Sequence, residues 1–251
     1  MSDPYISIII LTCNQCITTF NCLNALYPFP EDFEIIIVDN GSIDSTAEMI
    51  SQNFPEVKYI RHYKNLGVSY GRNAGISQST GQYVMLLDND TVPSVDAIRS
   101  LAYYLNTNKD CAIAAPRLVD SKGLTQRSFR EFPGILEKMR SILKISSDIV
   151  SKTEVPIKPI HPFYVLGAAQ MIRRTVFEKI GLFDNRIFYG PDDADICIRV
   201  RLSAAGEITY LPDIVIYHYW RRASRRFFSK LWYKHISSLF IFILPTDAFF
   251  S

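Results

Sequence analysis

The chain has 251 residues, of which 48% are hydrophobic and 21% charged, and its formal net charge is +2. This composition excludes a disordered chain, because the apolar residues suffice for one large core or two smaller ones. The charge is unevenly distributed, since 214–246 holds no Asp or Glu but six Lys and Arg residues, leaving 21 basic against 25 acidic residues elsewhere. A mildly acidic body with a basic, aromatic C-terminal tail indicates that one end contacts an anionic surface.

The two ends of the chain carry no predicted leader or membrane span. Met1-Ser2-Asp3-Pro4 lacks the charged start of a secretory signal, and strand-like sequence follows at once. The apolar run 239–244 is too short to cross a membrane. Five cysteines form no even framework, so we expect reduced thiols. These features predict a cytoplasmic protein.

Apolar runs alternate with helical patterns through the first half of the chain. Continuous apolar runs are typical of strands that are buried on both faces, as in parallel sheets. Capping residues such as Ser45 and Ser94 mark helix starts between them. The alternation predicts an α/β fold with a mostly parallel, doubly wound sheet and helices on both faces. The strands are predicted at 6–11, 34–39, 57–61, 83–88 and 111–115.

The pattern weakens after residue 120 and returns near 164. Residues 121–123 predict a turn, and 129–160 reads as a variable insertion without a clear period. In the strand 164–172, the small residues 167–169 let another backbone or a ligand approach closely. The later predictions are a helix capped at Thr175 and ended by Gly181, a helix from 192 to Gly206, strands at 208–211 and 214–218, and a basic amphipathic helix from Ser224.

Two aspartates, one residue apart, lie at the end of the strand predicted over 83–88. An apolar run leads directly into Asp88-Asn89-Asp90, and alternate residues of an extended chain point to the same side. Ligands bind at the carboxyl ends of strands in open α/β sheets, and paired carboxylates suit Mg²⁺ or Mn²⁺. The alternative is an Asx-turn before 91–93.

A third aspartate and a glycine-rich segment suggest a nucleotide site. Asp39 closes the strand 34–39, where an acid commonly binds a ribose hydroxyl or a base N–H. The alternative is an acid that caps the next helix. The glycines of 67–75 would let the backbone approach a nucleotide beside Arg72, although helix–sheet packing explains them almost as well. Cys13-x-x-Cys16 is a redox pattern, but that interpretation leaves the aspartates unexplained.

Acidic residues also gather at the start of the helix that begins at 192. The helix dipole stabilises carboxylates there without any function, but three acids within 192–195 exceed what a cap needs. Asp195 and Arg199 have the spacing of a structural ion pair. His218 ends a strand as Asp88 does, so it is either a metal or phosphate ligand or an ordinary histidine.

Taken together, these motifs resemble the inverting family two of GT-A (Rossmann-like) nucleotide-sugar glycosyltransferases, and most of all its rhamnosyltransferase-like branch. The resemblance spans about 6–240. Its motifs are Ser7-Ile8-Ile9-Ile10, Val38-Asp39-Asn40-Gly41-Ser42, Asn65-Leu66-Gly67, Gly71-Arg72-Asn73, Leu87-Asp88-Asn89-Asp90 and Asp192-Asp193-Ala194-Asp195.

The resemblance implies a role for each matching residue. Asp88 and Asp90 would be the DxD pair that holds Mn²⁺ or Mg²⁺, with His218 as a further ligand. Asp193 would be the general base, and Asp192 departs from the glutamate that is usual before it. The residues implied to bind the donor nucleotide are Thr12, Asn14, Asp39, Asn65, Arg72, Asp88 and Asn89.

The implied activity is metal-dependent inverting transfer, as in polysaccharide biosynthesis, from a UDP- or dTDP-sugar to a hydroxyl of a glycan or lipid-linked acceptor. A metal neutralises the leaving diphosphate, and a base activates the acceptor hydroxyl. We expect a catalytic domain over 1–220, with a nucleotide half (1–115) and an acceptor half (116–220), and a tail over 221–251. No nucleic-acid partner is expected. The tail either contacts an anionic membrane peripherally, at its inner face, or packs on the domain. The alternatives are a sugar nucleotidyltransferase and a non-catalytic nucleotide-sugar-binding partner.

Overall fold

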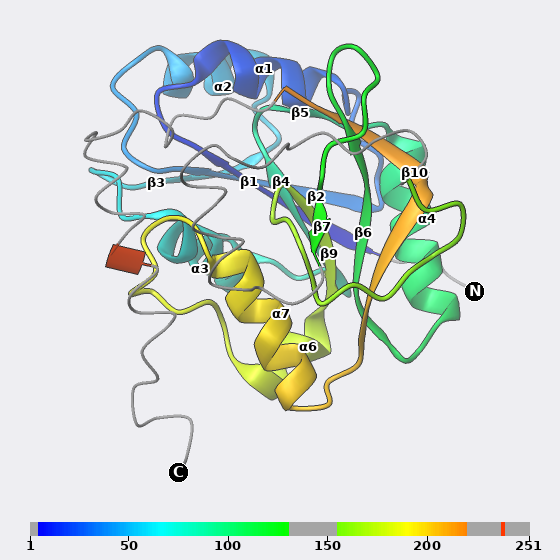
Figure 1. Cartoon of the computed structure of the whole chain (residues 1–251). Helices are drawn as coiled ribbons and strands as arrows, with labels where there is room; N and C mark the ends of the chain where they lie inside the picture. The colour runs from blue at the N-terminus through cyan, green and yellow to red at the C-terminus, as the bar shows by residue number, and fades with distance from the viewer. Residues whose placement is uncertain (1–4, 131–154, 220–236, 239–251) are drawn as a thin grey trace.

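The computed structural model describes residues 5–130, 155–219 and 237–238 (Figure 1). The predicted tail helix, apart from 237–238, and most of the predicted insertion lie outside these residues. Eight strands form one sheet in the order β3-β2-β1-β4-β9-β6-β10-β5. Their bounds are β1 Ile6–Thr12, β2 Phe33–Asp39, β3 Lys58–Arg61, β4 Tyr83–Asp88, β5 Thr91–Val92, β6 Cys111–Val119, β9 Ala169–Arg173 and β10 Glu207–His218.

Most neighbouring strands of this sheet are parallel, as predicted. Strands β1 to β4 run parallel to one another, and β10 runs parallel to β6. Strand β9 lies antiparallel between β4 and β6, and β5 pairs antiparallel with the end of β10. A separate two-stranded sheet joins β7 (Phe129–Arg130) to β8 (Tyr164–Val165). The α/β fold class is therefore confirmed.

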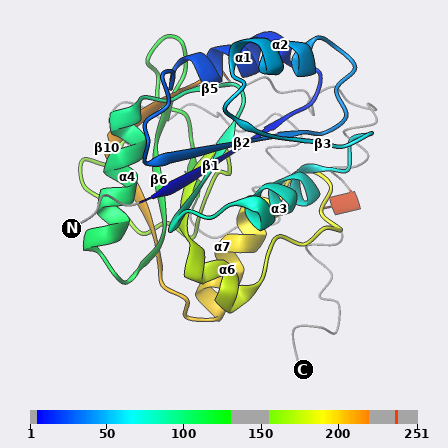
Figure 2. The same ribbon diagram turned by 180° about the vertical axis from the view of Figure 1, so that it is seen from behind.

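Helices cover both faces of the large sheet, because the strands bury side chains on both sides. Ile8 and Ile10 of β1 belong to one apolar cluster with residues of α1, α2 and α4, whereas Ile9 belongs to the other with residues of α3, α6 and α7. In Figures 1 and 2, α1 and α2 lie on one side of the sheet and α3, α6 and α7 on the other. The helix bounds are α1 Cys16–Asn24, α2 Thr46–Asn53, α3 Val68–Gln78, α4 Val95–Thr107, α6 Arg174–Ile180 and α7 Asp192–Leu202.

Of the predicted helix caps, Ser94 was right, Ser45 was right in position but not in its hydrogen bond, and Thr175 was wrong. The Ser94 hydroxyl accepts a hydrogen bond from the backbone N–H of Ala97 at 3.1 Å. Ser45 is the residue that precedes α2, as predicted, but its side chain makes no such bond; the Asp44 carboxylate accepts from the N–H of Thr46 at 3.1 Å. The second predicted cap, Thr175, lies inside α6. Gly181 ends that helix with a φ of 77°, as predicted.

Three predicted boundaries in the second half of the chain were also wrong. The strand predicted over 164–172 divides into β8 and β9 around Gly167. The two strands predicted over 208–218 form one strand, β10, with a register shift between Leu211 and Val215. Helix α7 ends at Leu202 and not at Gly206. Among the described residues, no helix is long and apolar enough to span a membrane.

Candidate active site

The side chains predicted to hold a metal lie together at one edge of the sheet. Asp88 ends β4, His218 ends β10, and Asp90 lies immediately before β5. Strand β5 pairs with β10 in a register that sets Thr91 opposite His218, which brings Asp90 beside the imidazole. One ligand atom from each of Asp88, Asp90 and His218 lies within 4.8 Å of the others. The Nε2 atom of His218 lies 3.3 Å from Oδ1 of Asp90.

This donor set fits a divalent cation. Two carboxylates and one imidazole suit Mn²⁺, which accepts oxygen and nitrogen ligands, and the carboxylates alone suit Mg²⁺. The side chains of His218 and Asp90 are only 5% and 13% exposed, whereas that of Asp88 is 43% exposed. An ion held here would therefore be enclosed on the protein side and open to further ligands beside Asp88.

Arg72 connects this cluster to the start of α7. Its guanidinium donates to the carboxylate of Asp192, to Oδ1 of Asp88 at 3.3 Å and to the carbonyl oxygen of Gly167 at 2.8 Å. A Cβ atom on Gly167 would lie 2.6 Å from Nη1 of Arg72, so the glycine leaves room for the guanidinium. The small residue predicted to admit a backbone or a ligand in fact admits an arginine side chain.

The acids around Arg72 hold their protons more tightly than usual. Burial raises the pKa of Asp192 to about 6, with Arg72 opposing the rise. Protein atoms also crowd the Asp88 carboxyl, although part of that side chain stays accessible. The resulting loss of hydration raises the pKa of Asp88 to about 6, while Arg72 lowers it and Asp90 raises it further.

Asp193 differs from both its acidic neighbours in α7. Its carboxylate accepts from the backbone N–H of Gly167 at 3.3 Å and from that of Ala194 at 2.7 Å. Asp193 is half-buried, whereas Asp192 is buried against Arg72. Asp195 bonds Arg199 at 2.8 Å, which confirms the predicted structural pair. Asp192 and Asp195 are thus buried in their ion pairs with Arg72 and Arg199, and Asp193 is the most accessible of the three acids.

The predicted nucleotide residues line the same edge of the sheet. In the strand register Thr12 lies opposite Asp39, and its neighbour Leu11 lies opposite Asp88. The carboxyl ends of β1, β2 and β4 therefore meet, as expected for a ligand site of an open sheet.

Asp39 is fully buried and organises the loop after β2. Its carboxylate accepts from the backbone N–H of Ser42 at 2.7 Å and from the hydroxyl of Tyr59 at 2.5 Å. Burial and this bond raise the pKa of Tyr59, which keeps the phenol protonated as a donor. Asn14 supports the same loop, because its Oδ1 accepts from the N–H of Ile43 at 2.8 Å.

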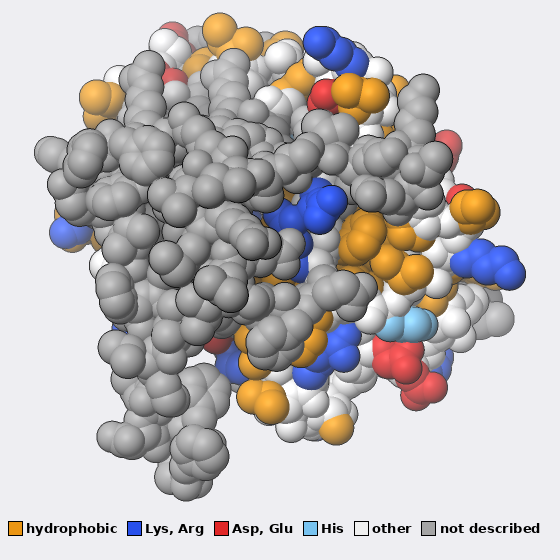
Figure 3. Space-filling model, in the orientation of Figure 1, with side chains coloured by type: hydrophobic (Ala, Val, Ile, Leu, Met, Phe, Trp, Pro, Cys, Tyr) orange, Lys and Arg blue, Asp and Glu red, His pale blue; other side chains and the backbone are white. Residues whose placement is uncertain are grey.

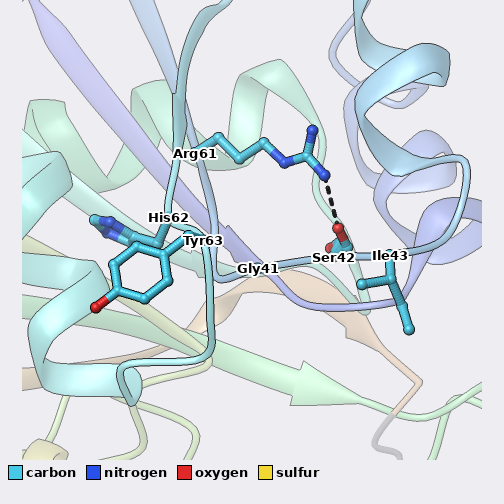
Figure 4. Close-up of a pocket in the computed structure, with 6 residues that line it drawn as sticks. All are labelled: Gly41, Ser42, Ile43, Arg61, His62 and Tyr63. Atoms are coloured by element: carbon cyan, nitrogen blue, oxygen red, sulfur yellow. Dashed lines mark hydrogen bonds between the residues drawn. The ribbon is translucent and has the colours of Figure 1, made fainter.

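A pocket of about 420 Å³ opens beside this loop. Figure 4 shows the Arg61 side chain reaching toward the 41–43 loop, where it donates to the carbonyl oxygen of Ser42 at 2.9 Å, whereas the rings of His62 and Tyr63 point away from that loop. Sequence reasoning placed Asp39 in this region but missed Arg61, which ends β3, and the two residues that follow it, His62 and Tyr63. Nothing in the sequence around these residues indicates a ligand site, because they lie beside the 41–43 loop only through the pairing of β3 with β2 in the folded sheet.

Three other predicted nucleotide residues hydrogen-bond within the protein. The Asn89 amide donates to the hydroxyls of Thr12 at 3.2 Å and Thr19 at 2.9 Å, and all three residues are buried. Asn65 is exposed, and its Oδ1 accepts from the N–H of Gly67 at 2.9 Å. These contacts position the loops of the site, and the nucleotide roles of the residues stay predictions. Cys13 is free, and burial raises its pKa, which disfavours a reactive thiolate.

The comparison with known families decides what kind of protein carries this site. The family model described as "Glycosyl transferase family 2" matches residues 7–181. The chain belongs to glycosyl transferase family 2. It is therefore a glycosyltransferase and not a sugar nucleotidyltransferase.

Relatives and solved structures agree with this assignment. The rhamnosyltransferase WbbL of Escherichia coli strain K12 is 24% identical over 225 residues, which cover 85% of this chain and 83% of the relative. The N-acetylglucosaminyl-diphospho-decaprenol L-rhamnosyltransferase of Mycobacterium tuberculosis is 23% identical over 230 residues, covering 83% and 74%. The crystal structure of GalNAc-T7 with UDP, GalNAc and Mn²⁺ superposes with a TM-score of 0.65 at 17% identity. That superposition covers 88% of this chain and 44% of the GalNAc-T7 chain, and it supports the GT-A fold.

Proposed function

We propose that this glycosyltransferase is metal-dependent and inverting, and moves a sugar from a UDP- or dTDP-sugar to a hydroxyl of a glycan or lipid-linked acceptor. The observation that carries the proposal is the cluster of Asp88, Asp90 and His218, which lies at the same sheet edge as the Asp39 loop. The rhamnosyltransferase relatives support it, one of them named for a diphospho-decaprenol acceptor. So does the Mn²⁺ with UDP in a structural neighbour.

The cluster would hold Mn²⁺ or Mg²⁺ through Asp88, Asp90 and His218. Such a cation, when bound, neutralises the negative charge that develops on a departing nucleoside diphosphate. The exposed side of Asp88 is where phosphate oxygens would approach. The pocket formed by 41–43 and 61–63 would receive the nucleoside, with Asp39 and Asn14 holding its loop in shape.

Asp193 is the proposed general base. An acceptor hydroxyl is a poor nucleophile until a positioned group takes its proton. Asp193 lies at the first turn of α7, held by the N–H of Gly167 at 3.3 Å, and Arg72 connects its neighbour Asp192 to the metal cluster. Asp192 is buried in its ion pair with Arg72, so its carboxylate is less accessible to an acceptor hydroxyl than the half-buried carboxylate of Asp193. Asp88 and Asp90 would thus hold the metal, and Asp193 would take the proton of the acceptor hydroxyl. Inverting transfer in a single displacement requires both functions.

Calorimetry with nucleoside diphosphates tests the metal site directly. UDP, dTDP and GDP are titrated into the protein with and without Mn²⁺, and the account predicts metal-enhanced binding of UDP or dTDP. Asp90→Asn should abolish the enhancement because it removes a ligand charge while keeping the shape. Asp213→Asn is the matched control, since Asp213 is an exposed acid on the same strand as His218. Metal-enhanced binding that survives Asp90→Asn would reject the assignment.

The basic tail is proposed to contact an anionic membrane or a lipid-linked acceptor. On the face in Figure 3, charged side chains of the described residues lie in small separate groups, whereas 221–234 carries six basic residues among aromatic ones. Replacing those six residues by Gln should weaken flotation with anionic vesicles. Substitution is preferable to truncation, because Ser238 accepts from the backbone N–H of Phe188 at 3.0 Å. Equal flotation of both proteins would reject the contact.

A further inference from the structure

Gln126 contacts the proposed metal ligand His218 twice. Its Nε2 donates to the backbone carbonyl oxygen of His218 at 2.7 Å, and its Oε1 lies 2.7 Å from Nδ1 of the imidazole. Both residues are buried, with 2% and 4% of their surface exposed. A buried side-chain amide that uses both of its ends on one residue has little freedom to turn.

The fold holds Gln126 in this place. A turn closed by the N–H of Gly123 and the carbonyl of Asp120 returns the chain along the end of β6. The N–H of Gln126 then donates to the carbonyl of Leu118 at 2.9 Å. Leu118 lies opposite Ile216 in the neighbouring strand β10, two residues before His218. Gln126 therefore reaches His218 from a backbone that the sheet fixes.

These two contacts determine which imidazole nitrogen carries the proton. A carbonyl oxygen only accepts, so the Gln126 atom that faces the carbonyl of His218 must be the amide nitrogen. The amide oxygen consequently faces Nδ1, and because it too only accepts, Nδ1 must be the donor. In the neutral ring the lone pair is then on Nε2.

The Nε2 atom is the one that faces the acids. It lies 3.3 Å from Oδ1 of Asp90, and Asp88 lies within 4.8 Å of both. A nitrogen lone pair and a carboxylate oxygen repel each other at this distance unless a cation or a proton lies between them. The arrangement of Gln126, His218 and Asp90 is thus the one that a bound divalent cation favours.

We propose that Gln126 is a positioning residue that fixes His218 in the Nδ1–H tautomer and presents its Nε2 lone pair to a divalent cation shared with Asp88 and Asp90. The inference rests on the proposed metal-dependent function. Without Gln126 the ring is free to carry its proton on Nε2 and donate to Asp90. That hydrogen bond would occupy the position where a cation binds, and Mn²⁺ affinity should fall about 10–100-fold.

Three variants separate positioning from packing. Gln126→Met keeps the length of the side chain but removes the acceptor. Gln126→Glu keeps an acceptor opposite Nδ1 and should recover most of the affinity. The matched control is Gln170→Met, because Gln170 is also fully buried and donates to a carbonyl, that of Val165 at 2.7 Å, without contacting His218 in the described structure.

Two measurements are made on the wild-type enzyme and these variants. Long-range ¹H–¹⁵N spectra of the metal-free protein at mildly alkaline pH report the His218 tautomer, with the signal assigned by its loss in His218→Asn. Electron paramagnetic resonance reports the affinity for Mn²⁺ alone. We expect an Nδ1–H ring in wild type and in Gln170→Met, and weaker Mn²⁺ binding with an Nε2–H ring in Gln126→Met.

The outcomes distinguish this inference from the proposed function. An Nε2–H ring in the wild-type enzyme, or unchanged Mn²⁺ affinity in Gln126→Met, would overturn the role of Gln126. An Nδ1–H ring in a wild-type enzyme that binds no Mn²⁺ would instead overturn the metal site itself.

Discussion

Replacing Arg72 by Met should destabilise the fold by about 3–5 kcal/mol, because it removes one partner of a buried ion pair. The side chains of Arg72 and Asp192 are only 7% and 6% exposed. The guanidinium also donates to the Gly167 carbonyl at 2.8 Å and to the partly exposed Asp88 at 3.3 Å, so the change leaves two buried acceptors, Asp192 and the Gly167 carbonyl, without their donor. For a domain of this size, 1 kcal/mol corresponds to roughly 2–4 °C, which predicts a fall in Tm of about 6–20 °C.

Urea unfolding followed by circular dichroism measures the loss. The control is Arg99→Met, the same change in a pair with Asp32 whose arginine side chain is 50% exposed, where at most about 1 kcal/mol is expected. In the double variant Arg72→Met with Asp192→Asn, the second change should cost much less than it does alone, since the two groups interact directly. Equal losses for Arg72→Met and Arg99→Met, or additive losses in the double variant, would refute the reasoning.

Two further predictions concern the acids and the glycine around this pair. Asp193→Asn should lower the turnover rate roughly 10²–10⁴-fold at nearly unchanged stability, whereas Asp192→Asn should act mainly on stability. Transfer assays on both variants, run well below their unfolding temperatures, check this, and a fast Asp193→Asn enzyme would show that the base is another group. Gly167→Ala should cost about 1–3 kcal/mol in urea unfolding because its Cβ would meet Arg72 at 2.6 Å. The loss of stability caused by Gly167→Ala should be smaller in an Arg72→Met background. An equal loss in both backgrounds would contradict a clash with Arg72.

The parts of the fold that follow from local patterns were predictable from the sequence. The apolar run that ends in Asp88 was assigned as a buried strand, and it is β4. Capping was less predictable, since Ser45 precedes α2 without a side-chain cap bond and it is the neighbouring Asp44 carboxylate that accepts from the first N–H of the helix, that of Thr46. The single strand β10 looked like two, because the register shift after Leu211 interrupts the apolar pattern without ending the hydrogen bonding to β6.

Site residues were predictable where the type of residue and its position at the end of a strand indicate a function. They were less predictable where the function depends on contact with a residue far away in the sequence. Asp88 and His218 were singled out because each ends a predicted strand, and Asp90 because it lies two residues after Asp88. The pairing of Arg72 with Asp192 joins residues 120 positions apart, and no local pattern contains that contact. Gln126 was missed for the same reason, since only the approach of the 120–126 segment to β10 shows what it does.

The most direct test of the account measures release of nucleoside diphosphate from UDP- and dTDP-sugars as a function of divalent metal. The account predicts release with Mn²⁺ or Mg²⁺, its loss after chelation, and its recovery when the metal is restored. Asp90→Asn should stay inactive at every metal concentration, and the exposed-site control Asp213→Asn should behave as the wild-type enzyme does. Release that continues unchanged after chelation, or that survives in Asp90→Asn, would contradict a metal site built from Asp88, Asp90 and His218.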